Sequence, residues 1–73
     1  MFKIKLPWSI TFTQTVKGRI NTYSLPEGFE VNYETIILPD NQIDIRLWDV
    51  EANGFATLIY DSEKEFKEDF NIV

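Results

Sequence analysis

The sequence predicts a small, mainly β protein, an antiparallel meander of five or six strands followed by one short C-terminal helix. Three observations carry this prediction. Apolar and polar residues alternate along the first half of the chain, as they do in half-buried strands. Clusters of Gly, Pro, Asn and Asp separate the apolar stretches at short intervals and mark turns. After Asp61 the apolar spacing changes to three or four residues, which is typical of a helix.

The 73 residues are enough for one domain, and we treat residues 1–73 as that single domain. The hydrophobic fraction of 44% and the aromatic fraction of 15% suit one small core and exclude a disordered tail. Gly and Pro number three each, which excludes a collagen-like chain. No apolar run approaches the roughly 20 residues of a membrane helix, so we expect no membrane contact.

The first sixteen residues predict two strands that share one inward face. Even-numbered residues from Phe2 to Phe12, including Trp8, are apolar, and the positions between them are mostly Lys, Ser and Thr. Pro7 interrupts this pattern, because proline cannot donate a hydrogen bond to the ladder. We therefore expect strands at about 2–6 and 8–16.

Lys17-Gly18 predicts a two-residue hairpin turn, and the return strand covers residues 19–23. With such a short loop the register follows from the turn. It places Phe12 opposite Tyr23, where two aromatic rings add packing.

The middle of the chain predicts three more strands. Residues 29–38 and 43–50 are joined by a turn at 39–42, and the apolar run 55–60 follows a second turn at 52–54. Along 43–50, the odd-numbered apolar residues are expected to face inward. Trp48 and Val50 then fall on the opposite face, which predicts cover on both sides at the end of this strand. The run 55–60 is expected to be a central strand.

A helix is expected at about 62–71. Ser62 and Glu65 form a capping box, and Phe66, Phe70 and Val73 recur at the spacing of one helical stripe. So short a helix is unstable alone and must dock its Phe residues on the sheet. Both a small SH3-like or OB-like barrel and an open sheet with the helix over one face are compatible with these elements.

Several classes of chemistry are excluded by what the chain lacks. It has no His and no Cys, and no Gly-rich loop that could hold a phosphate. A domain this thin also has little room for a deep, dry active site. We therefore predict that the protein is not an enzyme and needs no cofactor.

A partial calcium motif also fails. Residues 49–54 resemble the start of an EF-hand loop, D-x-[DN]-x-[DN]-G, but the twelfth position is Tyr60, which cannot supply the required bidentate carboxylate. The simpler interpretation is a hairpin loop, and we expect no metal site.

Charge is distributed unevenly along the chain. The net charge is −5, yet residues 1–26 contain four basic residues and no acid, whereas residues 27–73 contain all twelve acids and a net charge of −9. Basic and acidic strands could pair internally. Alternatively, the asymmetry could give the surface a dipole that steers a charged partner.

The main functional hypothesis is a small, acidic, non-enzymatic protein-binding module, such as an inhibitor or accessory factor. Its acidic rows could imitate the charge of a nucleic acid towards a basic partner protein. Trp is a favoured anchor of protein interfaces. The candidate contact residues are Glu30, Glu34, Trp48, Asp61, Glu65 and Glu68.

The alternative is a nucleic-acid-binding β domain that uses the basic N-terminal hairpin. Its candidate residues are Lys3, Lys5, Lys17 and Arg19. A free edge strand or a self-complementary sheet face would also suit a homodimer. The alternating pattern at the start of the chain is unlike a secretory signal, and the expected location is cytoplasmic.

Overall fold

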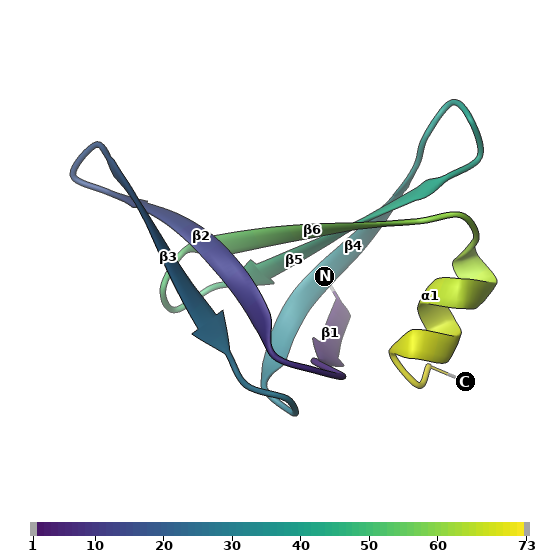
Figure 1. The fold of residues 1–73 in the computed structure, drawn as a ribbon, viewed down its shortest axis with the longest axis horizontal. Coiled ribbons are helices and arrows are strands. Elements are labelled where there is room, and N and C mark those ends of the chain that lie inside the picture. The colour runs from purple at the N-terminus through teal and green to yellow at the C-terminus, as the bar shows by residue number, and fades with distance from the viewer. Residues whose placement is uncertain (1, 73) are drawn as a thin grey trace.

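The computed structural model describes residues 2–72, and within them six strands form one antiparallel sheet followed by one short helix (Figure 1). The elements are β1 (Phe2–Lys5), β2 (Ile10–Val16), β3 (Arg19–Leu25), β4 (Glu30–Ile37), β5 (Ile43–Asp49), β6 (Gly54–Tyr60) and α1 (Glu63–Asp69). The predicted fold class, a mainly β chain with six antiparallel strands and one short C-terminal helix, is confirmed, but the predicted meander is limited to β4, β5 and β6. The sheet is not closed into a barrel, so the open alternative holds.

The strand order in the sheet is β1-β4-β5-β6-β2-β3. Strands β4, β5 and β6 form a meander, and β2 and β3 form a hairpin that joins the sheet beside β6. The chain then returns from β3 to β4, which lies next to β1. As a consequence, β1 and β3 are the two edges of the sheet.

The hairpin between β2 and β3 has the predicted register. Val16 lies opposite Arg19 and Phe12 lies opposite Tyr23, with ring centroids 6.0 Å apart. Both turn residues, Lys17 and Gly18, have positive φ angles, of 50° and 76°. Two positive φ angles define a type I′ turn, whose twist matches that of the strands.

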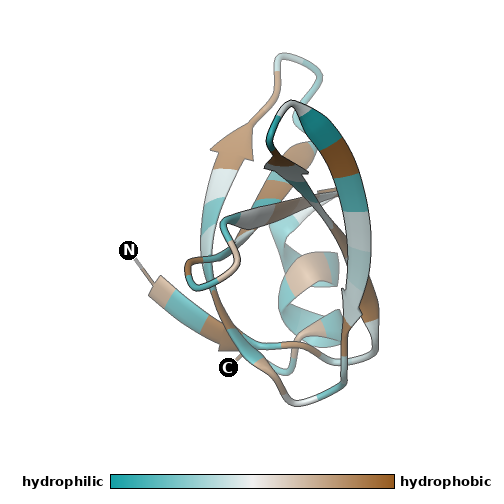
Figure 2. Ribbon diagram, turned by 90° about the vertical axis from the view of Figure 1, so that its left-hand side faces the viewer, coloured by the Kyte–Doolittle hydropathy of each residue, from teal (hydrophilic) through white to brown (hydrophobic). Residues whose placement is uncertain are grey.

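The core lies between the sheet and α1, on the side that we call the inner face. Phe66 and Phe70 of α1 are buried, as predicted, and the Ser62 hydroxyl accepts a hydrogen bond from the Glu65 backbone N–H. The third predicted member of the helix stripe, Val73, lies outside the described residues. The buried apolar residues are Ile4, Leu6, Ile10, Phe12, Leu25, Val31, Ile43, Ile45, Leu47, Phe66 and Phe70. Hydrophobic and hydrophilic segments alternate along the strands in Figure 2, as expected for a sheet with one buried face.

Two predictions about burial are wrong. Phe2 and Trp8, expected to face inward with their neighbours, are 72% and 42% exposed. Phe2 lies at the start of the edge strand β1. Trp8 lies in the bend at Pro7, where its ring is 5.8 Å from that of Phe70.

The end of β5 is also less covered than predicted. Val50 is 55% exposed, because no described element lies over the outer side of the sheet. β6 is central in the sheet, as expected, but Phe55 and Ile59 on its outer side are 53% and 62% exposed. Within residues 2–72, no helix has the length and apolar content needed to cross a bilayer.

Candidate functional site

The side of the sheet opposite α1, which we call the outer face, presents side chains of every interior strand. Side chains alternate across a strand. Along β5, Ile45, Leu47 and Asp49 are buried, so Arg46 and Trp48 belong to the outer face. The register extends this assignment to the neighbouring strands. The outer-face residues include Glu30, Asn32, Glu34, Ile36, Asp44, Arg46, Trp48, Phe55, Thr57, Ile59 and Thr13.

Trp48 and Phe55 form a stacked aromatic pair on this face, beside the turn that joins β5 to β6. They are direct cross-strand partners between β5 and β6, and their rings are 6.0 Å apart and inclined by only 6°. The turn at residues 50–53 brings them together, because it ends β5 and starts β6 with Asp49 opposite Gly54. An aromatic pair contributes about 0.5–1.5 kcal/mol beyond its buried area. The pair is therefore a preorganised, half-exposed apolar platform.

A shallow depression of about 330 Å³ lies beside the platform. Its lining includes Trp48, Phe55 and a charged pair of cross-strand neighbours, Glu34 and Arg46. The Arg46 Nε atom donates to Asp44 Oδ2 at 3.3 Å, which holds the guanidinium along β5. The depression thus combines an aromatic wall with both signs of charge, a composition suited to contact with another protein.

Two polar atoms of this face have no hydrogen-bond partner among the described residues. They are the indole Nε1 of Trp48 and the Oδ1 of Asp44, and both are buried. A buried polar atom without a partner costs about 1–3 kcal/mol. Among the described residues, Trp48 and Asp44 therefore each keep one buried polar atom whose hydrogen-bonding capacity is unused.

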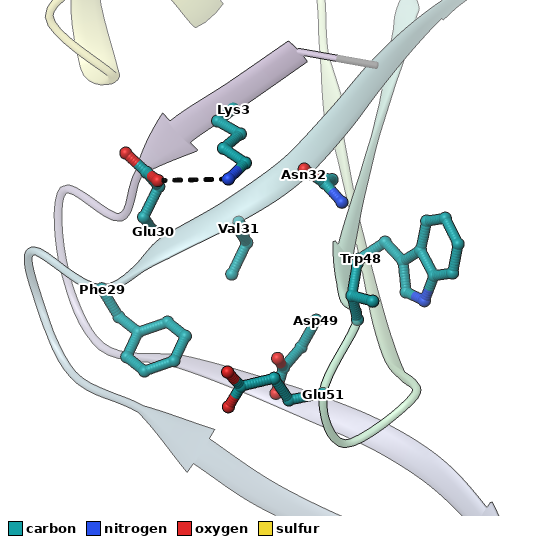
Figure 3. A pocket seen from close by; sticks show the side chains of 9 residues that line it. Lys3, Phe29, Glu30, Val31, Asn32, Trp48, Asp49 and Glu51 are labelled. Atoms are coloured by element: carbon teal, nitrogen blue, oxygen red, sulfur yellow. Dashed lines mark ion pairs between the residues drawn. The ribbon is translucent and has the colours of Figure 1, made fainter.

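A second depression, of about 170 Å³, lies where β4 begins and β5 ends (Figure 3). Figure 3 shows the Trp48 indole directed away from the carboxylates of Asp49 and Glu51. Lys3 and Glu30 form an ion pair of 3.9 Å at its rim, and both side chains are more than half exposed. Such an exposed pair adds little to stability.

Asp49 is committed to an internal contact. Its Oδ2 accepts a hydrogen bond of 2.8 Å from the Tyr23 hydroxyl, and the residue is buried. Burial, together with the hydrogen bond to this carboxylate and its charge, raises the pKa of Tyr23 to about 12. Asp49 therefore anchors β3 to the end of β5. Within residues 2–72, no cluster of three or more Asp and Glu side chains is arranged to hold a metal ion.

No family model, curated protein or solved structure matches this chain. The outer face and the charges around it are therefore the features of the molecule that point to a function.

The structure divides the six predicted protein-contact residues into two groups. Glu30, Glu34 and Trp48 share the outer face. The other three lie at α1, which packs on the inner face, and two of them already have partners. The Asp61 carboxylate accepts a hydrogen bond of 3.0 Å from Gln42 Nε2, and Glu68 pairs with Lys64 at 3.9 Å. Glu65 lies near the Tyr60 hydroxyl and, after burial and Asp69, contributes to raising the pKa of Tyr60 to about 12.

The four predicted nucleic-acid-contact residues are also separated. Lys3 and Lys5 lie on β1, whereas Lys17 and Arg19 lie at the tip of the β2–β3 hairpin. The strand order places β1 and β3 at opposite edges of the sheet. Lys3 is engaged with Glu30, so the internal pairing of basic and acidic strands holds at this position.

Sequence reasoning missed Phe55 and Arg46 as functional candidates. A signal for Phe55 was present, since a turn before Gly54 makes Trp48 and Phe55 cross-strand partners. It was obscured by the apolar run at 55–60, which resembles a strand buried on both sides.

Proposed function

We propose that this protein is a non-enzymatic protein-binding module that contacts its partner through the outer face of the sheet, with Trp48 and Phe55 as anchors. The observation that carries the proposal is the stacked pair itself. It is a half-exposed aromatic platform on an uncovered sheet face, and covering its rings with a partner would add stability. Aromatic anchors surrounded by polar side chains are typical of protein interfaces.

The charges around the platform indicate the chemistry of the partner. Asn32 of β4 lies opposite Trp48, and Glu30 and Glu34 are the outer-face residues on either side of Asn32 along the strand. The chain as a whole has a net charge of −5, which steers basic rather than acidic partners towards it. We therefore infer that the partner surface has an apolar centre that covers the two rings and a basic rim that meets Glu34, whereas Glu30 is already paired with Lys3.

The test is affinity capture with the wild-type chain and two matched variants. Phe55→Ser removes half of the platform, and Ile37→Ser removes an apolar side chain that is 75% exposed at the far end of β4. We expect the same partner protein with wild type and with Ile37→Ser, and a loss of at least about tenfold in its yield with Phe55→Ser. Circular dichroism checks that both variants are folded. Equal yields with the two variants would contradict the proposal.

The charge of the rim gives a second test on the same partner. Glu34→Lys reverses the charge next to the platform, whereas Glu68→Lys reverses a charge on α1 on the other side of the sheet. Weaker binding with Glu34→Lys alone is the expected result. A larger loss with Glu68→Lys would move the interface to the helix.

One observation favours the alternative, a nucleic-acid-binding domain. The side chains of Lys3 and Lys5 belong to the same face of the sheet as the aromatic platform. Single-strand binders combine positive charges with aromatic rings on which bases stack.

A binding assay with a labelled single-stranded oligonucleotide at low salt distinguishes the two functions. Binding that is lost in both Lys5→Glu and Phe55→Ser would support the alternative, and no binding at low salt would exclude it.

A further inference from the structure

The edge strand β3 lacks the features that prevent an edge from pairing with another chain, whereas the opposite edge strand, β1, has them. Edge strands present free N–H and C=O groups, and natural proteins protect them with lysines, prolines or short strands. β1 has four residues, of which two are Lys3 and Lys5. β3 has seven residues, no proline and one charge, Arg19, at its start. In Figure 1, β3 forms the border of the sheet away from α1, and no described element covers it.

The hairpin turn determines which backbone groups of β3 are free. In a type I′ turn, the residues on either side of the two central ones are hydrogen-bonded to each other, here Val16 and Arg19. Bonded and non-bonded pairs then alternate along an antiparallel ladder. The residues of β3 whose N–H and C=O groups point away from β2 are therefore Ile20, Thr22 and Ser24.

Two further contacts agree with this assignment. Side chains are closest at non-bonded pairs, and the hydroxyl oxygens of Thr11 and Ser24 are 3.2 Å apart. Thr13, opposite Thr22, must likewise direct its backbone groups away from β3. It does so towards β6, where it pairs with Phe55.

We propose that two copies of this chain associate through β3, as an antiparallel pair with its two-fold axis at Thr22. In this register Thr22 lies opposite Thr22 of the second copy, and Ile20 lies opposite Ser24. Each of these pairs has its N–H and C=O groups directed at the other strand, so each can exchange two backbone hydrogen bonds. A register displaced by two residues leaves one of the three outward-pointing residues unpaired.

The charges favour this same register, and they favour a second copy of the chain as the partner of β3. Arg19 lies opposite the apolar Leu25 of the second copy, so the two arginines stay far apart. Continued past the strand ends, the register brings Lys17 to the level of Glu27 of the second copy, and the two-fold axis repeats this contact. Pairing through β1 would instead bring the lysines of two copies together. A β1–β3 contact would be head-to-tail and would not close on itself.

The association is tested by sedimentation of the full chain from low to high micromolar concentration. The expected result is a concentration-dependent change from the 8.6 kDa monomer to twice that mass. Thr22→Lys places two like charges at the axis and should raise the dimer Kd by about tenfold or more. The matched control is Thr13→Lys, which puts the same residue one strand inward, on the same face.

Exchanging the charges of Lys17 and Glu27 tests the register without changing any residue of β3. Lys17→Glu and Glu27→Lys should each weaken the dimer, and the double variant should restore it. Failure of the double variant to restore association would overturn the register, whereas a monomer at every concentration would overturn the proposal.

Hydrogen exchange identifies the strand directly. In the dimer, the amides of Ile20, Thr22 and Ser24 should become protected as the concentration rises, whereas those of Asn21 and Tyr23 are protected at every concentration by β2. A dimer in which the Thr22 amide still exchanges rapidly would also overturn the proposal. The pairing leaves Trp48 and Phe55 exposed, so its failure would have no bearing on the proposed protein interface.

Discussion

Gly54 lies where the Tyr23 side chain meets the end of β6. A β-carbon at this position would overlap the Tyr23 hydroxyl and would lie 2.8 and 2.9 Å from two ring carbons. The requirement for glycine here is a matter of space, because Gly54, unlike Gly18 and Gly28, has no positive φ angle. The tyrosine cannot easily move away, since it stacks on Phe12 and donates to Asp49.

Gly54→Ala should therefore lower the free energy of unfolding by about 1–3 kcal/mol, the usual cost of overpacking. Urea unfolding measures this change. The same substitution in a Tyr23→Leu background should cost clearly less, because the end of the ring is no longer present. Equal costs in the two backgrounds would show that the contact with Tyr23 is not the cause.

Tyr23 and Tyr60 make stability depend on alkaline pH. Burial and a hydrogen bond to a carboxylate, Asp49 or Asp69, raise the pKa of each hydroxyl to about 12, from 10.0 for a free tyrosine. A pKa that is raised in the folded state means that the unfolded chain loses the proton first. The contribution is therefore fully present below pH 10.0 and is lost as the pH rises through about 12.

We expect the free energy of unfolding to fall over this alkaline interval, together with late ionisation of the two tyrosines in an absorbance titration. Tyr23→Phe combined with Tyr60→Phe should remove most of the pH dependence. If the double variant kept the wild-type alkaline slope, other groups would have to account for it.

The helix α1 depends on its contacts with the sheet, although all its backbone hydrogen bonds are local. It has seven residues, well below the length at which isolated helices are stable. The Phe66 ring lies about 5–6 Å from the rings of Tyr33, Tyr60 and Phe70, and the residue is almost fully buried.

Phe66→Ala should accordingly cost about 3–5 kcal/mol, enough to release the helix from the sheet. Thermal unfolding followed by circular dichroism measures the loss. Lys64→Ala is the control, because its ion pair with Glu68 is largely exposed and worth little. Similar losses in the two variants would mean that α1 is held by surface charges and not by its aromatic stripe.

The same elements show how far the sequence could predict the structure. The β2–β3 register was predictable, because a two-residue turn leaves no freedom in the pairing. The cap at Ser62 was predictable for a similar local reason. The position of β1 beside β4 was not, since alternation reveals which face a residue occupies and not which strand is its neighbour. The candidate site could be predicted only in part for the same reason. Trp48 was assigned to the outer face, but its partner Phe55 followed only from the pairing of β5 with β6.

At the scale of the whole molecule, the extents of 37 × 28 × 20 Å explain why the outer face is exposed. Packed layers are about 10 Å apart, so the shortest dimension accommodates the sheet and α1 and nothing further. The aromatic residues that alternation places on the outer side therefore have no third layer to cover them. Chain length alone predicted the thin architecture.

The short junction between β2 and β6 has a mechanical consequence. In the part of the chain that the structure describes, their ladder consists of one residue pair, Thr13 and Phe55. The hairpin is otherwise held by side chains. Phe12 and Leu25 lie in the core, the Tyr23 hydroxyl donates to Asp49, and the Gln14 amide donates to the Ala52 carbonyl. We therefore expect the β2–β3 hairpin to separate from the sheet more readily than the strands β4–β6, which are joined by long ladders, separate from one another.

Native-state hydrogen exchange in the Thr22→Lys background should therefore resolve two opening reactions, with the β2–β3 amides exchanging together before those of β5. Phe12→Ala should accelerate the first reaction and leave the second almost unchanged. A uniform acceleration of all amides would mean that the β2–β3 hairpin and the strands β4–β6 open as one cooperative unit.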